Sequence, residues 1–439
     1  MMSMRAAVAV FALALLLTAS ACGSASSGSV GGGQDSAGLV PPDALAFITV
    51  DTHLDSAGWT TIKHLTGGLP MLQKALHDQG LDLQRDVTPA LGDRLGLAVL
   101  GVTKGAPEAI ALTQSQDEAK LRTLASKFDH GSDHYTVERI GGWSVVADSK
   151  DAFDAVRNAQ SGRSLADVPG FQAATKELSG NSIAFAYASG AAVQQLSGSL
   201  GALIRGEGTP SWLAAQVTAD GNAVRVKVRR ESAKPGPAGY KPNLLQDVPS
   251  GALLAVSFKD AQGGLKQLAG AAGLGLPLGE LAPTLRGEGV LYLTQGVIIP
   301  TLVLELDSPD PAAAERSLRL VATRLTAKAG GALTLKVLRR GSRVYLTNAT
   351  SIPSPGARLA DDQPFKDALA AVDAPSEVTF LAYADVQRLA PVLQALSQLL
   401  GRASPRAGQL QRLDRLGTLV AFGASAGSTS RLELRLTGR

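Results

Sequence analysis

Stretches in which apolar and polar residues alternate are separated along the chain by stretches with apolar residues at helical spacing. Leu45–Val50 alternates with a period of two and predicts a strand, whereas Leu54–Gln79 has the spacing of a helix. Three predicted hairpins join Leu95–Val102 to Ala109–Thr113, Tyr135–Ile140 to Trp143–Ala147, and Trp212–Thr218 to Ala223–Arg229. Further helices are predicted over Asp117–Phe128, Phe153–Gln160 and Phe171–Leu178. Because hairpins dominate, we expect an α+β fold with mainly antiparallel sheets and helices packed on one face.

The same pattern occurs twice in the same order. The recurring blocks are Pro41–Val50 with Pro249–Phe258, Gly68–Pro70 with Gly275–Pro277, Phe171–Tyr187 with Phe365–Tyr383, and Arg225–Arg229 with Arg431–Arg435. An internal repeat of this kind predicts two tandem similar subdomains, at residues 40–230 and 247–439. The proline-rich stretch 231–246 between them is typical of a linker.

The N-terminal stretch has the pattern of an export signal. Arg5 is the only charge before Cys22, and Ala6–Leu17 is an unbroken small and apolar run that is too short to span a bilayer. Ala19–Ala21 then precede Cys22 in a pattern that resembles a bacterial lipobox. The resemblance implies cleavage after residue 21 and lipid attachment at Cys22. The alternative is an ordinary secretory signal cut near Ala21, which would leave a free thiol.

Cys22 is the only cysteine in the chain, so no disulfide framework is expected. The stretch 22–39 that follows is rich in Gly and Ser, carries the single charge of Asp35, and is predicted to be a disordered tether. We therefore expect a protein anchored to the cell membrane through Cys22, on its extracytoplasmic face.

The chain also resembles a known family. A lipobox, a low-complexity tether, the opening strand at Pro41–Val50, and the blocks Leu165–Phe171 and Leu359–Phe365 are similar to an uncharacterised family of bacterial exported lipoproteins, classed as a domain of unknown function. The resemblance covers most of residues 40–439. It implies no activity and no site residues.

Composition narrows the class of partner. Apolar residues make up 45% of the chain and charged residues 18%, with a formal net charge of +4. This balance does not favour nucleic acid, which usually requires a concentrated basic face. Aromatic residues are only 4%, which also argues against stacking on single strands.

Two motifs are candidates for chemistry. Gly423–Gly427 matches the G-x-S-x-G elbow around Ser425, but no histidine follows it and the next stretch is a predicted strand, so we expect a hairpin turn. His130, Asp133 and His134 offer two imidazoles and a carboxylate that would suit a zinc-like ion. The alternative, a solvated loop between a helix and a strand, is favoured because the segment is broken by glycine.

Other motifs are predicted to be structural. Gly273–Gly279 does not fit a phosphate-binding loop and is expected to be a tight loop, with the alternative of a mouth for an apolar ligand. Asp167, Asp361 and Asp362 precede helices and are expected to stabilise the helix N-termini. Arg225, Lys227 and Arg229 alternate with valines, which predicts a solvated strand face.

The sequence favours a non-catalytic, membrane-anchored extracytoplasmic lipoprotein that binds a ligand or an envelope partner, with no cofactor. One alternative is a carrier of a lipid or other apolar ligand, and another is a hydrolase with an unrecognised site. Phe185, Tyr187, Leu381 and Tyr383 are predicted to lie in the cores of their repeats, because they alternate on predicted strands that each follow a helix.

Overall fold

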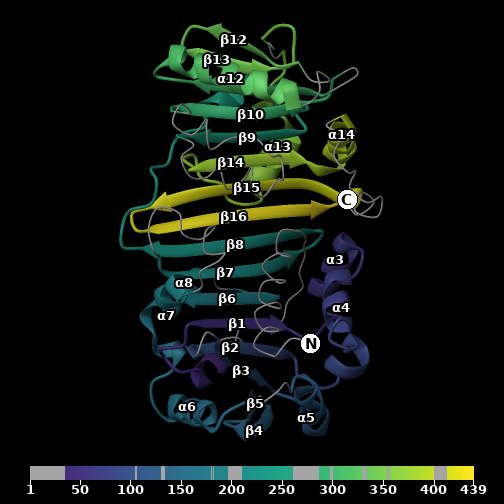
Figure 1. Ribbon diagram of the computed structural model, residues 1–439, viewed down its shortest axis with the longest axis vertical. Coiled ribbons are helices and arrows are strands. Elements are labelled where there is room, and N and C mark those ends of the chain that lie inside the picture. The colour runs from purple at the N-terminus through teal and green to yellow at the C-terminus, as the bar shows by residue number, and fades with distance from the viewer. Residues whose placement is uncertain are drawn as a thin grey trace. The chain divides into compact units, whose positions relative to one another are not determined.

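The computed structural model describes most of the chain after residue 34 (Figure 1). The described residues are 35–103, 106–129, 134–178, 180, 182–195, 210–260, 286–296, 300–328, 334–352, 356–399 and 413–439. Contacts between residues divide the chain into two compact units, Met1–Lys234 and Pro235–Arg439. Among the described residues, none of the helices combines the length and the apolar character that a membrane span requires.

Unit 1 contains eight described strands. They are β1 (Ala46–Asp51), β2 (Arg94–Thr103), β3 (Ala106–Thr113), β4 (Thr136–Ile140), β5 (Trp143–Ala147), β6 (Ala184–Ser189), β7 (Pro210–Asp220) and β8 (Ala223–Ser232). Its helices are α3 (Ala57–Thr66), α4 (Pro70–His77), α5 (Glu118–Ser126), α6 (Lys150–Ser161), α7 (Pro169–Glu177) and α8 (Gly190–Gln195). Shorter helical turns are η1 (Ser36–Leu39), the π-helical turn η2 (Leu83–Val87) and η3 (Leu165–Asp167).

Unit 2 also contains eight described strands. They are β9 (Leu254–Lys259), β10 (Glu288–Thr294), β11 (Thr301–Asp307), β12 (Lys336–Arg340), β13 (Arg343–Thr347), β14 (Phe380–Asp385), β15 (Leu416–Ala426) and β16 (Thr429–Gly438). Its helices are α12 (Pro311–Lys328), α13 (Gln363–Ala370) and α14 (Val386–Leu399), with 3-10 turns η4 (Asn243–Asp247) and η5 (Leu359–Asp361).

The strands of both units follow the same order. In unit 1 the order is β8-β7-β6-β1-β2-β3-β5-β4, and in unit 2 it is β16-β15-β14-β9-β10-β11-β13-β12. Every described strand pair within each unit is antiparallel. The α+β class and the mainly antiparallel pairing expected from the hairpins are therefore confirmed.

Matched backbone hydrogen bonds align the two units residue by residue. The matched pairs are Leu165 N–H to Val40 O (2.8 Å) with Leu359 N–H to Val248 O (2.9 Å), Val40 N–H to Ala37 O (3.2 Å) with Val248 N–H to Leu245 O (3.3 Å), and Leu45 N–H to Val99 O with Leu253 N–H to Leu293 O (both 2.8 Å). Val40 thus corresponds to Val248, and Leu39 to Asp247. Strand register extends the correspondence along the strands of the two units.

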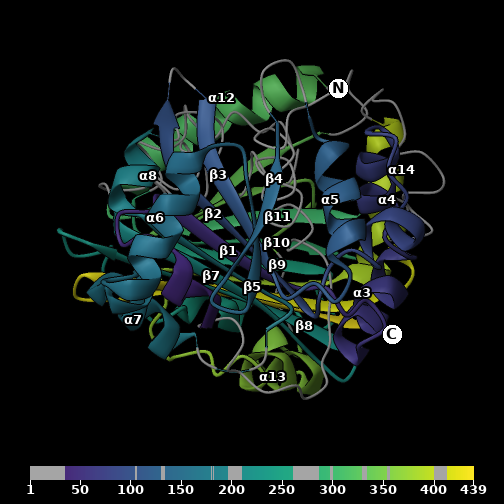
Figure 2. The ribbon, with the colours of Figure 1, turned by 90° about the horizontal axis from the view of Figure 1, so that it is seen from below.

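Helices cover both faces of each sheet, so the expectation of helices on one face was wrong. In unit 1, one face packs Phe47, Leu112 and Val145 beneath η1, α6 and α7. Residues of α3, α4 and α5 pack against the opposite face, as the two groups of helices in Figure 2 illustrate. Unit 2 likewise buries α13 on one face and α12 and α14 on the other. Alternating strand residues therefore enter two separate cores.

Phe171 on α7 lies at the centre of the first core of unit 1. Its ring meets those of Phe47 and Phe185 at 5.9 Å and that of Tyr187 at 5.2 Å, each in an edge-on arrangement that favours aromatic pairs. In unit 2, Phe365 meets Tyr383 at 5.2 Å in the same way. Phe185, Tyr187, Leu381 and Tyr383 are all buried, which confirms the core prediction.

The predicted helix Leu54–Gln79 is two helices, α3 and α4. Gly67 ends α3 in the left-handed region with φ +71°, a conformation that glycine adopts without steric cost. Gly68 follows with φ +106°, and Pro70 then occupies the first turn of α4, where its missing N–H leaves no intrahelical bond unmade. Periodicity alone predicted one helix because the apolar positions continue across this break.

The predicted tether 22–39 and the predicted linker 231–246 each include residues that belong to the folded units. Ser36–Leu39 form η1, and Ala37 and Leu39 are buried in the core of unit 1, so the folded body includes the end of the expected tether 22–39. The predicted linker 231–246 also contains folded residues. Tyr240 pairs with Val378 through backbone hydrogen bonds of 2.8 and 2.9 Å, so this part of the stretch belongs to unit 2.

The charged strand that closes unit 1 does not present a fully solvated face. Arg229 is buried, and its Nε lies 3.5 Å from Glu177 Oε2. Arg225 and Lys227 are half-buried. Alternation of charged and apolar residues correctly predicted the strand but not the burial of its polar side.

Candidate functional site

Most of the candidate residues named from the sequence have structural roles where the structure describes them. Ser425 lies on β15, and its hydroxyl is 3.0 Å from that of Ser430 across the β15–β16 hairpin, as expected for a turn. Asp167 Oδ2 accepts hydrogen bonds from the backbone N–H and the hydroxyl of Ser164, at 2.9 and 3.0 Å, in a capping box at η3. These bonds lower the pKa of Asp167.

The matching acids in unit 2 are also engaged by neighbouring backbone and side chains. Asp362 accepts from the Ser250 hydroxyl and from Gly251 N–H, the latter at 2.9 Å. Lys366 Nζ donates to the backbone carbonyl of Asp361 at 3.0 Å. Asp362 occupies the N-cap position of α13, but its carboxylate makes no capping hydrogen bond there and instead holds the loop that precedes β9, so the expected capping role is not confirmed for Asp362.

The predicted metal site cannot be assembled from the described residues. His130 and Asp133 lie outside them, as do Cys22 and Gly273–Gly279. The side chain of His134 is exposed, and its Nδ1 lies 3.3 Å from Asp129 Oδ2. Within the described parts of the chain, no group of three or more His, Cys, Asp or Glu side chains is placed to hold a metal ion.

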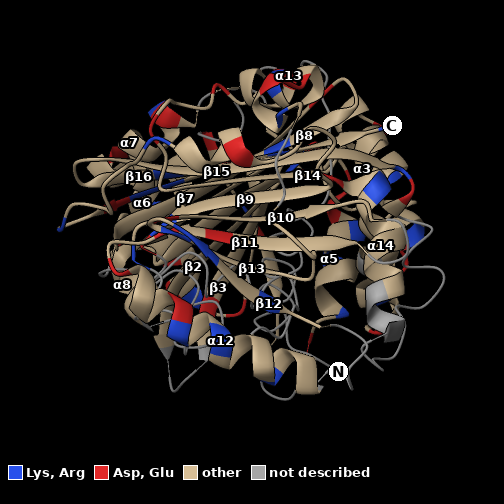
Figure 3. Cartoon of the chain, turned by 90° about the horizontal axis from the view of Figure 1, so that it is seen from above, with Lys and Arg blue, Asp and Glu red and all other residues tan. Residues whose placement is uncertain are grey.

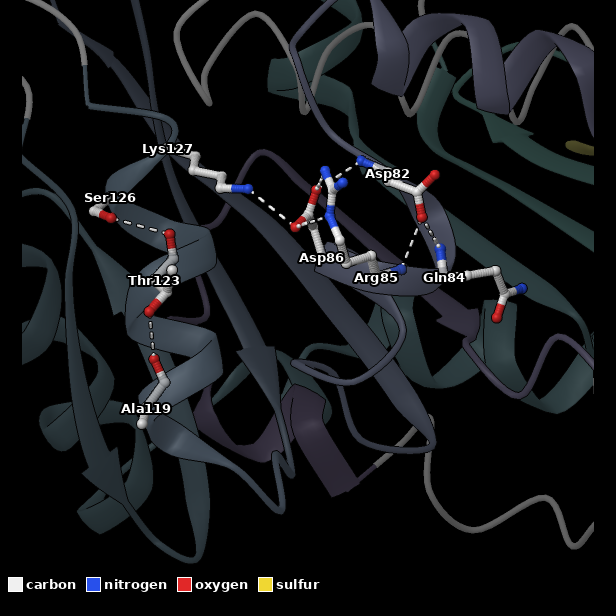
Figure 4. A network of polar contacts seen from close by, with 8 residues as sticks. All are labelled: Asp82, Gln84, Arg85, Asp86, Ala119, Thr123, Ser126 and Lys127. Atoms are coloured by element: carbon white, nitrogen blue, oxygen red, sulfur yellow. Dashed lines mark hydrogen bonds and ion pairs between the residues drawn. The ribbon is translucent and has the colours of Figure 1, made fainter.

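A polar network in unit 1 joins the π-helical turn η2 to the end of α5 (Figure 4). Asp86 Oδ1 lies 3.0 Å from Lys127 Nζ, and Asp86 Oδ2 accepts from Arg85 Nη2 at 3.0 Å and from Asp82 N–H at 2.8 Å. Asp82 Oδ1 in turn accepts from the backbone N–H groups of Gln84 and Arg85. The hydrogen bond from Arg85, followed by those from Asp82 and Lys127, holds the pKa of Asp86 well below its usual range. These contacts connect the residues of η2 with one another and with Lys127 after α5, so the role of the network is structural.

A different arrangement lies within the sheet of unit 2, around a buried carboxylate. Glu305 on β11 is 1% exposed. Its Oε1 accepts hydrogen bonds from Arg343 Nη1 at 2.9 Å and from the Tyr345 hydroxyl at 3.1 Å. Arg343 Nη1 also donates to Asp247 Oδ2 at 2.6 Å. We call Asp247, Glu305, Arg343 and Tyr345 the carboxylate cluster.

Strand register brings the cluster together. Glu305 pairs directly with Tyr345 across β11 and β13, and Asp307 pairs with Arg343, so these side chains share one face of the sheet. Asp247 ends η4, which packs on that face. The side chains of Arg343 and Asp247 are each 37% exposed, so they connect the buried Glu305 to solvent.

Burial, followed by the charge of Asp247, raises the pKa of Glu305 to about 7, although Arg343 and Tyr345 act in the opposite direction. Burial and the charge of Glu305 raise the pKa of Tyr345 to about 12. Glu305 therefore exchanges its proton near neutral pH. A carboxyl group with such a pKa, paired with an arginine that reaches the surface, has properties common at functional sites.

Unit 1 has apolar residues at all four equivalent positions. Register places Leu112 and Val145 where unit 2 has Glu305 and Tyr345, and Trp143 opens β5 as Arg343 opens β13. Leu39 corresponds to Asp247 through the matched hydrogen bonds of η1 and η4. All four apolar side chains belong to one buried core. The fold of a unit therefore does not require a charged side chain at any of these four positions.

Sequence analysis missed Glu305. It lies within the apolar stretch Val290–Leu306, whose strands β10 and β11 pair as β2 and β3 do in unit 1. The sequence indicated an unusual buried residue only through a single glutamate between Leu304 and Leu306. Aligning that hairpin with its partner, residue by residue, would have set Glu305 against Leu112.

Comparison of the chain with models of protein families, with curated proteins and with solved structures found no match.

Proposed function

We propose that the protein is a lipid-anchored extracytoplasmic binding protein, whose second unit recognises a ligand or envelope partner at the carboxylate cluster without catalysing a reaction. The observation that carries the proposal is the replacement of four apolar core residues of unit 1 by Asp247, Glu305, Arg343 and Tyr345 at the same positions of unit 2. Burying charged groups costs free energy that an apolar core avoids. A role other than folding would account for their presence.

The cluster suits recognition of an anionic group. The guanidinium of Arg343 presents a planar set of donors that matches a carboxylate or a phosphate. Asp247 occupies part of that set, and its side chain is exposed enough to exchange with a ligand anion. Glu305 stays behind the arginine and orients it through the 2.9 Å contact.

The proposed anchor rests on the sequence around Cys22, together with the position of the first folded turn. The core of unit 1 includes residues from Ala37 onward, so residues 23–34 separate the proposed lipid attachment from the described body. We also infer that the two units arose by duplication of one ancestral unit. The shared strand order and the matched hydrogen bonds support this inference. The family of exported lipoproteins that the sequence resembles remains the assignment that we propose.

Membrane fractionation tests the anchor. The Cys22→Ala chain is expected to leave the membrane fraction after a carbonate wash while keeping the circular dichroism of the wild type, because two acyl chains provide the stable attachment. A variant that stays in the membrane fraction would show that Cys22 is not the anchor.

Native mass spectrometry of the full chain, released gently from its own membrane, tests recognition. We expect a bound molecule or partner with wild type and its loss with the paired variant Glu305→Leu/Arg343→Leu, which gives these two positions apolar residues like those of unit 1. The matched control is Glu138→Gln/Arg157→Gln, which removes an exposed ion pair of unit 1. Equal binding by all three chains would place recognition elsewhere.

A further inference from the structure

Helix α12 and strand β12 expose a basic surface with an apolar residue at its centre. The basic side chains are Arg316, Arg319 and Arg324 of α12 and Lys336, Arg339 and Arg340 of β12, all exposed. The only acidic residue on these two elements is Glu315. With Lys328 at the end of α12, the two elements carry seven basic residues against one acidic residue, a formal excess of +6. Figure 3 shows the charges along α12. We call the six exposed basic residues and Leu320 the basic face.

The two elements are held together, so the charges belong to one surface. Leu318 and Val321 of α12 pack with Leu335, Val344 and Leu346 in a buried core. On the outside, Glu315 Oε1 accepts from Arg319 at 2.7 Å and Glu315 Oε2 lies 3.9 Å from Arg339 of β12.

Leu320 is 51% exposed in the middle of the arginines. It lies four residues after Arg316 and four before Arg324, which places the three side chains on one outward stripe of the helix. The inward stripe already supplies Ala314, Leu318, Val321 and Ala322 to the core. Folding of unit 2 therefore does not require an apolar residue at position 320.

The corresponding elements of unit 1 lack this character. Strand β4 has the place in the strand order of unit 1 that β12 has in unit 2. Along the chain, α5 leads into β4 as α12 leads into β12. They carry Lys120, Arg122 and Arg139 against Glu118 and Glu138, a formal excess of only +1. Arg122 and Arg139 both pair with Glu118. The excess of basic charge is thus a property of unit 2 and not of the fold.

We propose that the basic face binds the surface of a membrane that contains anionic lipids. Arginine and lysine side chains are attracted to the negative potential of such a surface, and an exposed leucine among them inserts at the boundary between headgroups and acyl chains. A purely anionic polymer would be bound by the charges alone and would not require Leu320. This contact is separate from the proposed lipid at Cys22 and from the carboxylate cluster.

Vesicle sedimentation of the full chain carrying Cys22→Ala tests the proposal without the anchor. The vesicles contain equal parts of phosphatidylcholine and phosphatidylglycerol, with phosphatidylcholine alone as reference. We expect binding to the anionic vesicles that weakens as salt is added. Arg316→Gln/Arg324→Gln should lower the partition coefficient about 25-fold, at about fivefold for each basic residue.

The matched control is Lys120→Gln/Arg122→Gln on α5, which removes the same charge from unit 1 and should change binding less than about twofold, because α5 is not part of the basic face. Leu320→Ser should weaken binding about fivefold and leave its salt dependence in place. The side chains substituted on α5 and α12 are exposed, and circular dichroism checks that the fold is kept.

Equal losses in the α5 and α12 variants would overturn the proposal, as would wild-type binding by Arg316→Gln/Arg324→Gln. Loss with the arginine variant but not with Leu320→Ser would also overturn it, in favour of an anionic polymer. Because every chain carries Cys22→Ala, none of these results depends on whether Cys22 is the anchor.

Discussion

Glu305 on β11 occupies the sheet position that Leu112 occupies on β3. Leu112 lies between Gly96 of β2 and Val145 of β5, and Glu305 lies in the same way between Val290 and Tyr345. One fold thus accommodates an alkyl group and a buried carboxylate at the same point. The difference between them is the main chemical distinction between the two units, and it gives direct tests.

Removing the arginine partner alone should destabilise unit 2. Arg343→Leu leaves the buried Glu305 without its charge partner. Because the arginine is 37% exposed and the carboxyl can take up a proton, we expect a loss of about 1–3 kcal/mol. Glu305→Leu/Arg343→Leu removes both charges. Its free energy of unfolding should lie within about 1 kcal/mol of the wild-type value, because apolar replacement of a buried pair is often neutral or stabilising.

Urea unfolding followed by circular dichroism measures these two variants together with Glu305→Leu, and the double-mutant cycle formed with the wild type isolates the interaction. If Arg343→Leu and the double variant lose the same free energy of unfolding, Glu305 does not depend on Arg343. In that case the cluster is held together by its other contacts.

The carboxylate cluster should also make stability depend on pH. Burial raises the pKa of Glu305 to about 7 in the folded protein, against about 4.3 in an unfolded chain. Between these two values the folded state holds a proton that the unfolded state has released, so stability falls as pH rises. The contribution is fully present below about pH 4 and decreases by about 3–4 kcal/mol on approaching pH 7.

Denaturant unfolding of wild type and Glu305→Gln across this range measures the difference. The variant should lack the fall in stability with rising pH that Glu305 contributes. Glu377→Gln, at an exposed position of the same unit, serves as the control and should follow the wild-type curve. Parallel curves for wild type and Glu305→Gln would mean that Glu305 titrates near its ordinary value.

Phe171 should contribute more to stability than any exposed apolar residue of unit 1. It is buried against three aromatic rings, so Phe171→Ala should cost about 3–5 kcal/mol through lost contacts and the cavity that remains. Val102→Ala at the exposed end of β2 should cost less than about 0.5 kcal/mol. Similar unfolding midpoints for the two variants would contradict this packing.

Gly287 should not tolerate a side chain. Its φ is +95°, and a Cβ there would overlap the carbonyl oxygen of Asp307 on the adjacent strand. Gly287→Ala should therefore cost more than about 3 kcal/mol, since backbone strain and a clash with main-chain atoms add. Gly427→Ala, with φ +59° and open space around the Cβ, should cost only about 1–2 kcal/mol. A thermal melt of each variant compares them.

Alternation and turn residues were enough to predict most strands of unit 1. Gly141 and Gly142, for example, marked the β4–β5 turn, where both adopt positive φ. Burial on both faces was not predicted, because α3, α4 and α5 pack on residues that alternate with those beneath α7. Periodicity within a strand identifies two faces but does not determine which helix covers each.

The candidate site was harder to predict than the fold. Histidines and serines were considered because of their residue type. Glu305 acquires its raised pKa only from strand pairing and from η4, most of which lies within the stretch 231–246 that was expected to be a linker. Sequence distance also separates the partners: Asp247 and Arg343 are 96 residues apart. Only the register of β11 with β13 brings Glu305 and Arg343 within hydrogen-bond distance.

The way in which the chain enters unit 1 has a mechanical consequence. Leu39 and Val40 are buried, and Val40 O accepts the hydrogen bond from Leu165 before the chain continues into β1. Strand β1 is hydrogen-bonded to β2 on one side and to β6 on the other. A pulling force applied from the N-terminal side would therefore load β1 in shear against both neighbours at once. Resistance to such a force depends on the barrier to unfolding and not on the equilibrium stability alone.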